Sequence, residues 1–334
     1  MLRPGGESYV VLIPVLDDWE ALGQLLELLD KEFAERSLRA RVLVIDDGSQ
    51  LPPPPSFRSL QLSVLREIDI LRLRRNLGHQ RAIAVGLAYI AEHLRCTAVV
   101  VMDGDGEDRP SDVPRLVEGL YQTTGDHAVF ARRARRSERI LFKIGYVAFC
   151  ALHRILTGLR VEVGNFSVLP MVVVGRLGSV AEMWNHYAAA VVKARIPRTL
   201  IATDRGTRLA GHSRMNVLGL VTHGFSAMSV FADRIGIRLL VASSALGVAA
   251  AIGLVVVLLV RFRTDLATPG WATSTMGLLG VLLLQAVMLT FVFAVAVQSG
   301  RSGGSFLPSR DYTYFIESLS RLGSPDVGVP VPRP

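Results

Sequence analysis

The sequence predicts an α/β fold, a mostly parallel sheet with helices on both faces, followed by a part that spans a membrane. Short apolar runs alternate with helical patterns from residue 9 to about 131, which is typical of parallel strands joined by crossover helices. Polar side chains follow each of the first four apolar runs. Two later segments, at about 239–260 and 276–297, hold about 20 largely apolar residues without a charge, which is enough to cross a bilayer.

The alternating region predicts five strands and three helices. Val- and Ile-rich runs bounded by turn residues predict strands at Tyr9–Val15, Arg41–Ile45, Ile68–Leu73, Ala98–Met102 and His127–Ala131. Apolar residues at helical spacing predict helices at Trp19–Arg36, Gln80–Leu94 and Pro114–Tyr121. A glycine inside the second of these helices, Gly86, is expected to allow close helix–sheet packing.

Two further segments, at about 138–157 and 214–237, are apolar but interrupted by charge. Their basic flanks favour amphipathic helices lying in the membrane interface, although core-facing helices fit the same pattern. The expected organisation is an α/β domain at 8–213, a juxtamembrane helix at 214–237, two transmembrane helices at 238–298, and a tail at 299–334 whose end is disordered.

Composition points to a membrane protein with an anionic partner. The 334 residues are 50% hydrophobic with a formal net charge of +8, and the mean hydropathy is +0.37. The positive charge fits an anionic membrane surface or a polyanionic substrate, and no nucleic-acid-binding motif is present. Two isolated cysteines and scattered histidines argue against zinc and against a disulfide.

The charge distribution predicts a multi-pass topology in the cell membrane. Two spans place the α/β domain and the tail on the same side, and the basic residues before the first span place that side in the cytoplasm. Arg261 and Arg263, in the short loop between the spans, argue weakly for the opposite orientation.

Polar residues at four strand ends predict one ligand site. Asp17 follows the first strand, Asp46 and Asp47 the second, Asn76 the third, and Asp103-Gly104-Asp105 the fourth. Because carboxyl ends of parallel strands meet in one crevice, these side chains are expected to converge. Closely spaced carboxylates suit Mg²⁺ or Mn²⁺, held together with substrate phosphates. Helix caps and turns would explain one or two of these positions, but less well one on every crossover.

Two arginine clusters are candidates for binding phosphate. Arg132, Arg133, Arg135 and Arg136 follow the last strand, and Arg205, Arg208 and Arg214 precede the juxtamembrane helix. A guanidinium group matches phosphate oxygens with two parallel hydrogen bonds. Attraction to anionic lipid headgroups is the alternative, and for the first cluster the two interpretations weigh equally.

Six motifs carry a resemblance to a known family. They are Ile13-Pro14-Val15 with Asp17-Asp18, Val44–Ser49, Arg75–Gly78, Met102–Pro110, Gly164–Leu169 and Arg205–Arg214. With these motifs the chain resembles family 2 glycosyltransferases of the GT-A fold. The similarity is to the polyprenyl-phosphate branch, which includes dolichol-phosphate mannose synthases and bacterial undecaprenyl-phosphate glucosyltransferases, and it extends to about residue 298.

The resemblance implies an inverting enzyme that moves a hexose from a nucleotide diphosphate sugar to a polyprenyl phosphate, with Mg²⁺ or Mn²⁺. It implies donor contacts at Pro14, Val15, Asp17, Asp46, Asp47, Asn76, Gly78, Asp103 and Arg132. It implies metal ligands at Asp103, Asp105 and Glu107, and acceptor contacts at Asn165, Arg205, Arg208, Ser213 and Arg214. The catalytic set would be Asp103, Asp105, Arg205 and Arg208.

One departure from the family pattern keeps alternatives open. Asn165 stands where relatives usually carry Asp, and an amide cannot take a proton. A phosphate acceptor needs little help from a base, because it is already largely an anion at neutral pH. A lipid alcohol acceptor, such as a sphingolipid or diacylglycerol, and a non-catalytic scaffold with a vestigial donor site are the rival interpretations. The sugar, the choice of UDP or GDP, and a homo-oligomeric state stay open.

Overall fold

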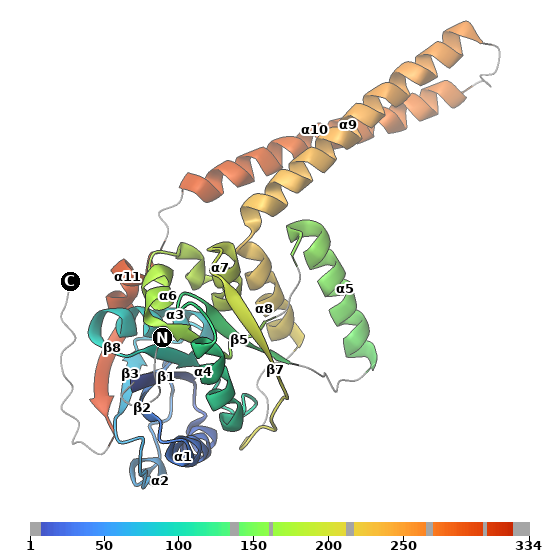
Figure 1. The fold of residues 1–334 in the computed structure, drawn as a ribbon. Coiled ribbons are helices and arrows are strands. Elements are labelled where there is room, and N and C mark those ends of the chain that lie inside the picture. Colours follow the sequence, from blue (N-terminus) through green and yellow to red (C-terminus); the bar gives the residue numbers. More distant parts are fainter. Residues whose placement is uncertain are drawn as a thin grey trace. The chain divides into compact units, whose positions relative to one another are not determined.

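The computed structural model describes residues 8–133, 140–159, 163–211, 217–264, 270–302 and 306–322. The chain divides into two units (Figure 1). The larger unit is an α/β domain that also includes the end of the chain, and the smaller unit contains the two long helices.

The α/β domain is built on one eight-stranded sheet of order β7-β5-β6-β4-β1-β2-β3-β8. Its strands are β1 (Ser8–Val15), β2 (Arg39–Asp46), β3 (Ile68–Leu73), β4 (Ala98–Val101), β5 (Ala128–Arg133), β6 (Ser167–Pro170), β7 (Arg198–Thr203) and β8 (Ile316–Arg321). Strands β1 to β4 form a parallel core, and β5 pairs in parallel with β7. The expected mostly parallel α/β sheet is therefore confirmed.

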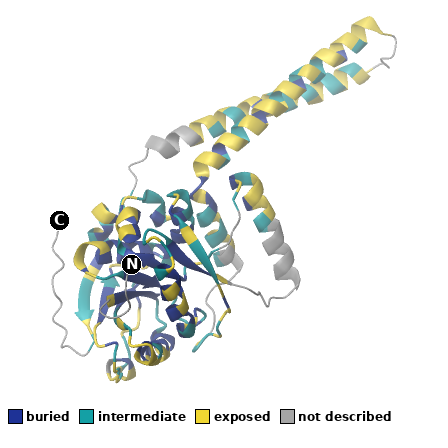
Figure 2. Cartoon of the chain, viewed as in Figure 1, coloured by how far each residue is buried: buried dark blue, intermediate teal, exposed yellow. Residues whose placement is uncertain are grey.

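Helices cover both faces of this sheet (Figure 1). One face packs against α1 (Trp19–Glu35) and α4 (Val113–Tyr121), and the other against α3 (His79–His93), α6 (Met171–Leu177) and α7 (Tyr187–Lys193). Along β1, Val10 and Leu12 belong to one core cluster, while Tyr9, Val11 and Ile13 belong to the other. From Tyr9 onward both faces of the strand are buried (Figure 2), which explains its run of apolar residues.

Gly86 has the packing role that the sequence predicts. A Cβ atom at this position in α3 would collide with Leu12 of β1 and would lie 3.0 Å from a side-chain carbon of Ile45 in β2. The absence of a side chain therefore lets α3 lie close against the sheet.

The antiparallel strands were not expected from the sequence. Strand β6 pairs with both β4 and β5 in the antiparallel sense, so β5 is not the direct neighbour of β4. Both β6 and β7 are short and lie among irregular segments, η2 (Ala181–Trp184) included, which hides their pattern in the sequence.

The segment that contains β8 joins the sheet, a difference from the expected domain boundary at residue 213. Strand β8, within the segment that the sequence analysis treated as a tail, pairs antiparallel with β3. It follows α11 (Pro308–Asp311) and η3 (Tyr312–Phe315). The buried carboxylate of Asp69 in β3 accepts hydrogen bonds from Arg41 Nε at 2.7 Å and Arg321 Nε at 2.9 Å, so β8 contributes one of its two cationic partners. The expected disorder of 323–334 lies outside the described residues.

The smaller unit contains α9 (Ala232–Arg263) and α10 (Trp271–Ser302), which pack against each other as a helical hairpin. By length and composition, both are able to cross a membrane, and the two expected spans lie within them. Small residues line the contact, where Ser243 Oγ and Thr290 Oγ1 lie 2.9 Å apart and a Cβ on Gly247 would meet Ala286 at 3.4 Å. Many large apolar residues of both helices are exposed, and Figure 2 shows exposed positions along both helices, as expected of surfaces that contact lipid.

The two expected interfacial segments are helical. They form α5 (Ile140–Thr157) and α8 (Val217–Ser229). The second helix is shorter than expected, because residues 232–237 already belong to α9. Both carry exposed apolar side chains, among them Leu152 and Ile155 on α5 and Phe225 on α8. Their location in a membrane interface stays a prediction.

Candidate functional site

The candidate site lies at the carboxyl ends of the parallel strands. The chain runs from β1 to β2 to β3 in one direction across the sheet and then returns to place β4 on the other side of β1. The strand order therefore reverses between β1 and β4, and the loops after these two strands leave the sheet in opposite directions. In open α/β sheets, ligands bind in the crevice at such a reversal. These two loops carry Asp17, Asp18 and the segment Asp103–Arg109, which we call the acidic loop.

Carboxylates of the first two strand ends hold neighbouring loops in place. Asp17 Oδ1 accepts hydrogen bonds from the backbone N–H groups of Gln50 at 2.7 Å and Leu51 at 3.1 Å. Asp46 is buried, and its Oδ1 accepts a hydrogen bond from Ser49 N at 2.8 Å. The two side chains thus shape the loop after β2.

Asp47 fixes the next loop rather than facing the crevice. Its carboxylate accepts hydrogen bonds from the backbone N–H groups of Leu77 at 2.7 Å and Gly78 at 2.9 Å. Burial raises the pKa of Asp47 to about 6, despite the two hydrogen bonds that favour the charged form. Asn76 closes a local turn in the same loop, where its Oδ1 accepts a hydrogen bond from Gly78 N. Asp47 and Asn76 therefore fix the conformation of the loop around Gly78.

The acidic loop is paired with an arginine-rich segment that follows β7. This arginine segment, Asp204–Gly211, is joined to the acidic loop by two backbone hydrogen bonds, from Gly206 N to Glu107 O at 2.8 Å and from Leu209 N to Asp105 O at 2.9 Å. A Cβ on Gly206 would collide with the carbonyl oxygen of Gly106, so the close approach of the two segments requires glycine.

Two arginines of this segment engage the predicted metal ligands. Arg205 forms a forked pair with Glu107, with Nε to Oε2 at 2.9 Å and Nη2 to Oε1 at 2.7 Å. Arg208 Nη1 lies 3.0 Å from Asp105 Oδ2, and its other terminal nitrogen pairs with Asp18. The structure thus brings two of the three expected metal ligands, Asp105 and Glu107, together with two of the arginines expected to bind phosphate.

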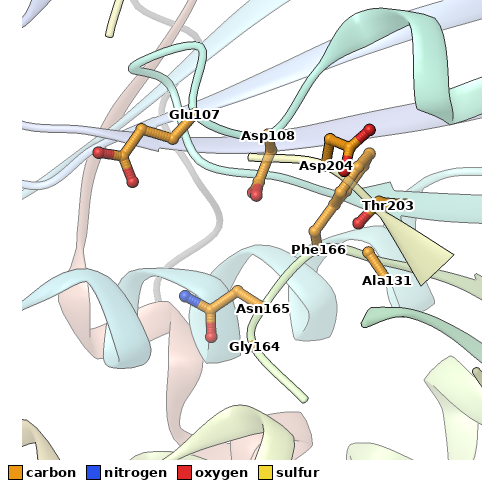
Figure 3. A pocket seen from close by; sticks show the side chains of 8 residues that line it. All are labelled: Glu107, Asp108, Ala131, Gly164, Asn165, Phe166, Thr203 and Asp204. Carbon is orange, nitrogen blue, oxygen red and sulfur yellow. The ribbon is translucent and has the colours of Figure 1, made fainter. Parts of the chain in front are cut away.

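Asn165 lies beside Asp103. Its Oδ1 accepts a hydrogen bond from Gln80 Nε2 at 2.9 Å, and its Nδ2 donates to Asp103 Oδ1 at 3.4 Å. Together with Glu107, Asp108 and Asp204, Asn165 lines a small cavity, in which Asp108 and Asn165 extend from opposite walls (Figure 3). Asp108 Oδ2 also accepts a hydrogen bond from Asp103 N at 3.1 Å, so it shapes the acidic loop.

The structure leaves Arg132 apart from this cluster. Arg132 is exposed on β5, and no contact between it and the acidic loop is present among the described residues. Ser213 and Arg214 lie outside the described residues. Pro14 and Val15 are buried at the end of β1, where Val15 O accepts a hydrogen bond from Asp47 N at 2.8 Å.

Sequence reasoning missed two residues of the site. Gln80 stands at the start of a helix, and no pattern distinguishes it from an ordinary polar helix residue. Asp108 lies within the same motif as the expected metal ligands, and as the fourth acidic residue of the stretch Asp103–Asp108 it carries a usable signal.

The carboxylates present fit a divalent cation in their chemistry. Asp105 and Glu107 supply oxygen ligands of the kind that Mg²⁺ and Mn²⁺ prefer, and both are already matched with positive charge. Among the described residues, no group of three or more His, Cys, Asp or Glu side chains is arranged to hold a metal ion. A cation here would therefore complete its coordination with donor phosphates and water.

Residues 10–165 match the family model of glycosyl transferase family 2. This part of the chain belongs to that family. The matched residues contain β1 to β5, the acidic loop and Asn165. The expectation of a glycosyltransferase is confirmed.

Among relatives of this glycosyltransferase is an uncharacterized glycosyltransferase, YkcC, of Bacillus subtilis. It is 22% identical over 309 residues, which cover 88% of this chain and 89% of the relative. Undecaprenyl-phosphate 4-deoxy-4-formamido-L-arabinose transferase of Erwinia tasmaniensis is 29% identical over 148 residues, which cover 44% of each chain. The chain is also similar to a crystal structure of glucosyl-3-phosphoglycerate synthase from Mycobacterium tuberculosis in complex with Mn²⁺, UDP-glucose and phosphoglyceric acid. The TM-score is 0.48 at 16% identity, with 70% of this chain and 86% of that one covered.

Proposed function

We propose that this glycosyltransferase moves a sugar from a nucleotide diphosphate sugar to a polyprenyl phosphate in a membrane. The observation that carries the proposal is the pairing of Arg205 and Arg208 with Glu107 and Asp105. Groups suited to phosphate and groups suited to a divalent cation lie within hydrogen-bond distance of each other. The named activity of the Erwinia relative and the two apolar helices support a lipid-linked acceptor.

The reaction would be a single in-line displacement. A phosphate oxygen of the acceptor forms a bond to the anomeric carbon of the sugar, and the bond from that carbon to the donor diphosphate breaks. The nucleoside diphosphate leaves with the electron pair, and the anomeric configuration inverts. Mg²⁺ or Mn²⁺, when bound, supplies positive charge to the leaving diphosphate.

The chain's own residues would bind and orient the reactants. Asp105 and Glu107 would hold the cation, with Asp103 close to the donor sugar or ribose. Arg205 and Arg208, which pair with these carboxylates in the structure, would bind phosphate oxygens with paired N–H groups if the two carboxylates held a cation. The same arginines would thus balance carboxylate charge in one state and phosphate charge in the other.

Asn165 supports an acceptor that is already an anion. Its amide cannot accept a proton in the reaction, and its two polar atoms are engaged by Gln80 and Asp103. A phosphomonoester has a second pKa of about 6 and attacks without a base, whereas an alcohol needs one. The acceptor class therefore favoured at Asn165 is a lipid phosphate rather than a lipid alcohol.

The membrane arrangement belongs to the proposal as well. Helices α9 and α10 would cross the membrane, with the α/β domain on the cytoplasmic side because basic residues such as Arg234 and Arg238 precede the first span. A reporter inserted within 266–273 is expected on the opposite side from reporters at Met1 and Pro334. A cytoplasmic signal from 266–273 would contradict the two-span topology.

The acceptor is tested by a paired assay on the full chain in nanodiscs. The same preparation receives a panel of UDP- and GDP-sugars with either polyprenyl phosphate or the dephosphorylated polyprenol. Product from the phosphate alone supports the proposal. Equal or greater product from the alcohol, from a sphingolipid or from diacylglycerol would contradict it and favour a lipid alcohol acceptor.

The phosphate-binding role of the arginines is tested in the same assay. Arg205→Ala and Arg208→Ala are expected to lose transfer, and Arg208→Lys is expected to restore only part of it, because a single ammonium cannot replace a forked guanidinium. Unchanged transfer by Arg208→Ala would remove the arginines from the mechanism.

A further inference from the structure

A chain of hydrogen bonds runs from helix α7 to Asp103. Tyr187 N donates to Gln80 Oε1 at 2.6 Å, Gln80 Nε2 donates to Asn165 Oδ1 at 2.9 Å, and Asn165 Nδ2 donates to Asp103 Oδ1 at 3.4 Å. These residues come from four separate parts of the sequence, and the family match ends at Asn165, before Tyr187.

The direction of every bond in this chain follows from its first member. Tyr187 N is a backbone amide, which only donates, so the oxygen of the Gln80 side chain must face it. The NH₂ group of Gln80 must then face Asn165, whose oxygen accepts. The NH₂ group of Asn165 is left facing Asp103. The hydrogen-bond partners therefore fix the orientation of both side-chain amides.

Burial makes this direction hard to reverse. Gln80 is 7% exposed and Tyr187 is fully buried, so an unmatched polar atom at either position has no access to bulk water. Tyr187 is the first residue of α7, where backbone N–H groups have no acceptor within the helix, and Gln80 supplies that acceptor.

A second connection holds the backbone of Asn165. The Tyr187 hydroxyl lies 2.7 Å from Ser167 Oγ, which donates to Asn165 O at 2.8 Å. Ser167 is fully buried in β6. Tyr187 therefore fixes Asn165 twice, through Gln80 at the side chain and through Ser167 at the backbone.

We propose that Gln80 is a positioning residue that acts through Asn165, and that Asn165 serves this site as a hydrogen-bond donor to Asp103. Asn165 holds the Asp103 carboxylate in one orientation toward the nucleotide sugar. This inference rests on the proposed function only for the role of Asp103 in donor binding, and it is independent of the acceptor.

The variant that tests the direction is Gln80→Glu. A glutamate accepts the hydrogen bond from Tyr187 N but has no N–H to donate to Asn165, so the Asn165 amide must turn its oxygen toward Asp103. We expect the affinity for UDP or GDP with Mn²⁺, measured by calorimetry without acceptor, to fall about 10-fold, as for a lost hydrogen bond to a charged group. Gln122→Glu, an exposed position at the end of α4, adds the same charge and serves as the control.

A double-mutant cycle separates positioning from general damage to the fold. If Gln80 acts through Asn165, Gln80→Glu has no further effect on nucleotide affinity in the Asn165→Ala background. Asn165→Asp, which still accepts from Gln80 but no longer donates, is expected to weaken binding at least as much as Asn165→Ala. Additive losses in the cycle, or wild-type affinity in Asn165→Asp, would overturn the proposal.

A readout without nucleotide keeps the inference separate from the proposed function. In protein labelled with ¹⁵N-asparagine, the side-chain NH₂ signal of Asn165, identified by its loss in Asn165→Ala, is expected to shift in Gln80→Glu and to stay in place in Gln122→Glu. An unchanged signal in Gln80→Glu would contradict the relay. Failure of the wild type to bind UDP or GDP would count against the proposed donor while leaving this signal as the test of the relay.

Discussion

Arginine and metal should compete for the acidic loop, so removing either arginine should tighten metal binding in the absence of nucleotide. In the structure, Arg205 pairs with Glu107, and Arg208 pairs with both Asp105 and Asp18. A cation that binds these carboxylates must first break the ion pairs. The variants Arg205→Ala and Arg208→Ala remove that cost.

The expected gain in Mn²⁺ affinity depends on how far each ion pair is exposed to solvent. The Arg205 side chain is 42% exposed and that of Glu107 22%, so this pair is screened and contributes about 0–1 kcal/mol. Arg208 is 19% exposed and bridges two partly buried carboxylates. Hydrogen bonds to charged groups contribute about 1.5–3 kcal/mol, and partial exposure lowers this to about 1–2 kcal/mol. We therefore expect Mn²⁺ affinity to rise by up to about 5-fold in Arg205→Ala and roughly 5- to 30-fold in Arg208→Ala.

The assay is Mn²⁺ binding followed by electron paramagnetic resonance on the full chain, without donor or acceptor. Arg115→Ala is the control, because it removes the same charge from an ion pair with Asp112, outside the acidic loop. Tighter Mn²⁺ binding together with lost transfer would identify arginines that oppose the metal in the empty site and bind phosphate in the loaded one. Unchanged or weaker Mn²⁺ binding by Arg208→Ala, relative to the control, would refute the competition.

Three further predictions concern the metal ligand, pH and the end of the chain. Asp105→Asn is expected to abolish transfer while the melting temperature stays within a few degrees of wild type; near-normal activity with Mg²⁺ and Mn²⁺ would contradict its role. Burial raises the pKa of Asp47 above its unfolded value of about 3.9, so its stabilising contribution is present below about pH 4 and lost as pH rises through about 6. Asp47→Asn should therefore gain up to about 2–3 kcal/mol in unfolding free energy relative to wild type between pH 4 and pH 7, and an equal difference at both values would refute this. Arg321→Ala removes one partner of the buried Asp69 carboxylate and should lower stability by about 1 kcal/mol in thermal unfolding, whereas an unchanged melting temperature would show that Arg41 suffices.

The sequence by itself determined the parallel core, the two long helices and the neighbourhood of the site. Strands β1, β2 and β4 consist largely of apolar residues buried on both faces, and Asp17, Asp46 and Asp103 lie at their carboxyl ends or within two residues after them. The convergence of these ends therefore follows from local pattern and the geometry of crossover connections. Helices α9 and α10 follow from uninterrupted hydropathy, which is also local information.

Only the tertiary structure decided how the site's charges and amides are matched. The arginine segment pairs with the acidic loop from about 100 residues away, as in Arg205 with Glu107, and no spacing rule encodes such a contact. Strand β8 is short and polar in places, so its sequence does not predict the pairing with β3. In the structure, this pairing brings Arg321 to the buried carboxylate of Asp69. In the sequence, Gln80 does not differ from any other polar residue at a helix start, and its role becomes visible only when folding places Tyr187 N and Asn165 on either side of it. Periodic burial is readable along the chain because it repeats at short range, whereas the hydrogen-bond direction of a buried amide is set by partners that only folding brings together.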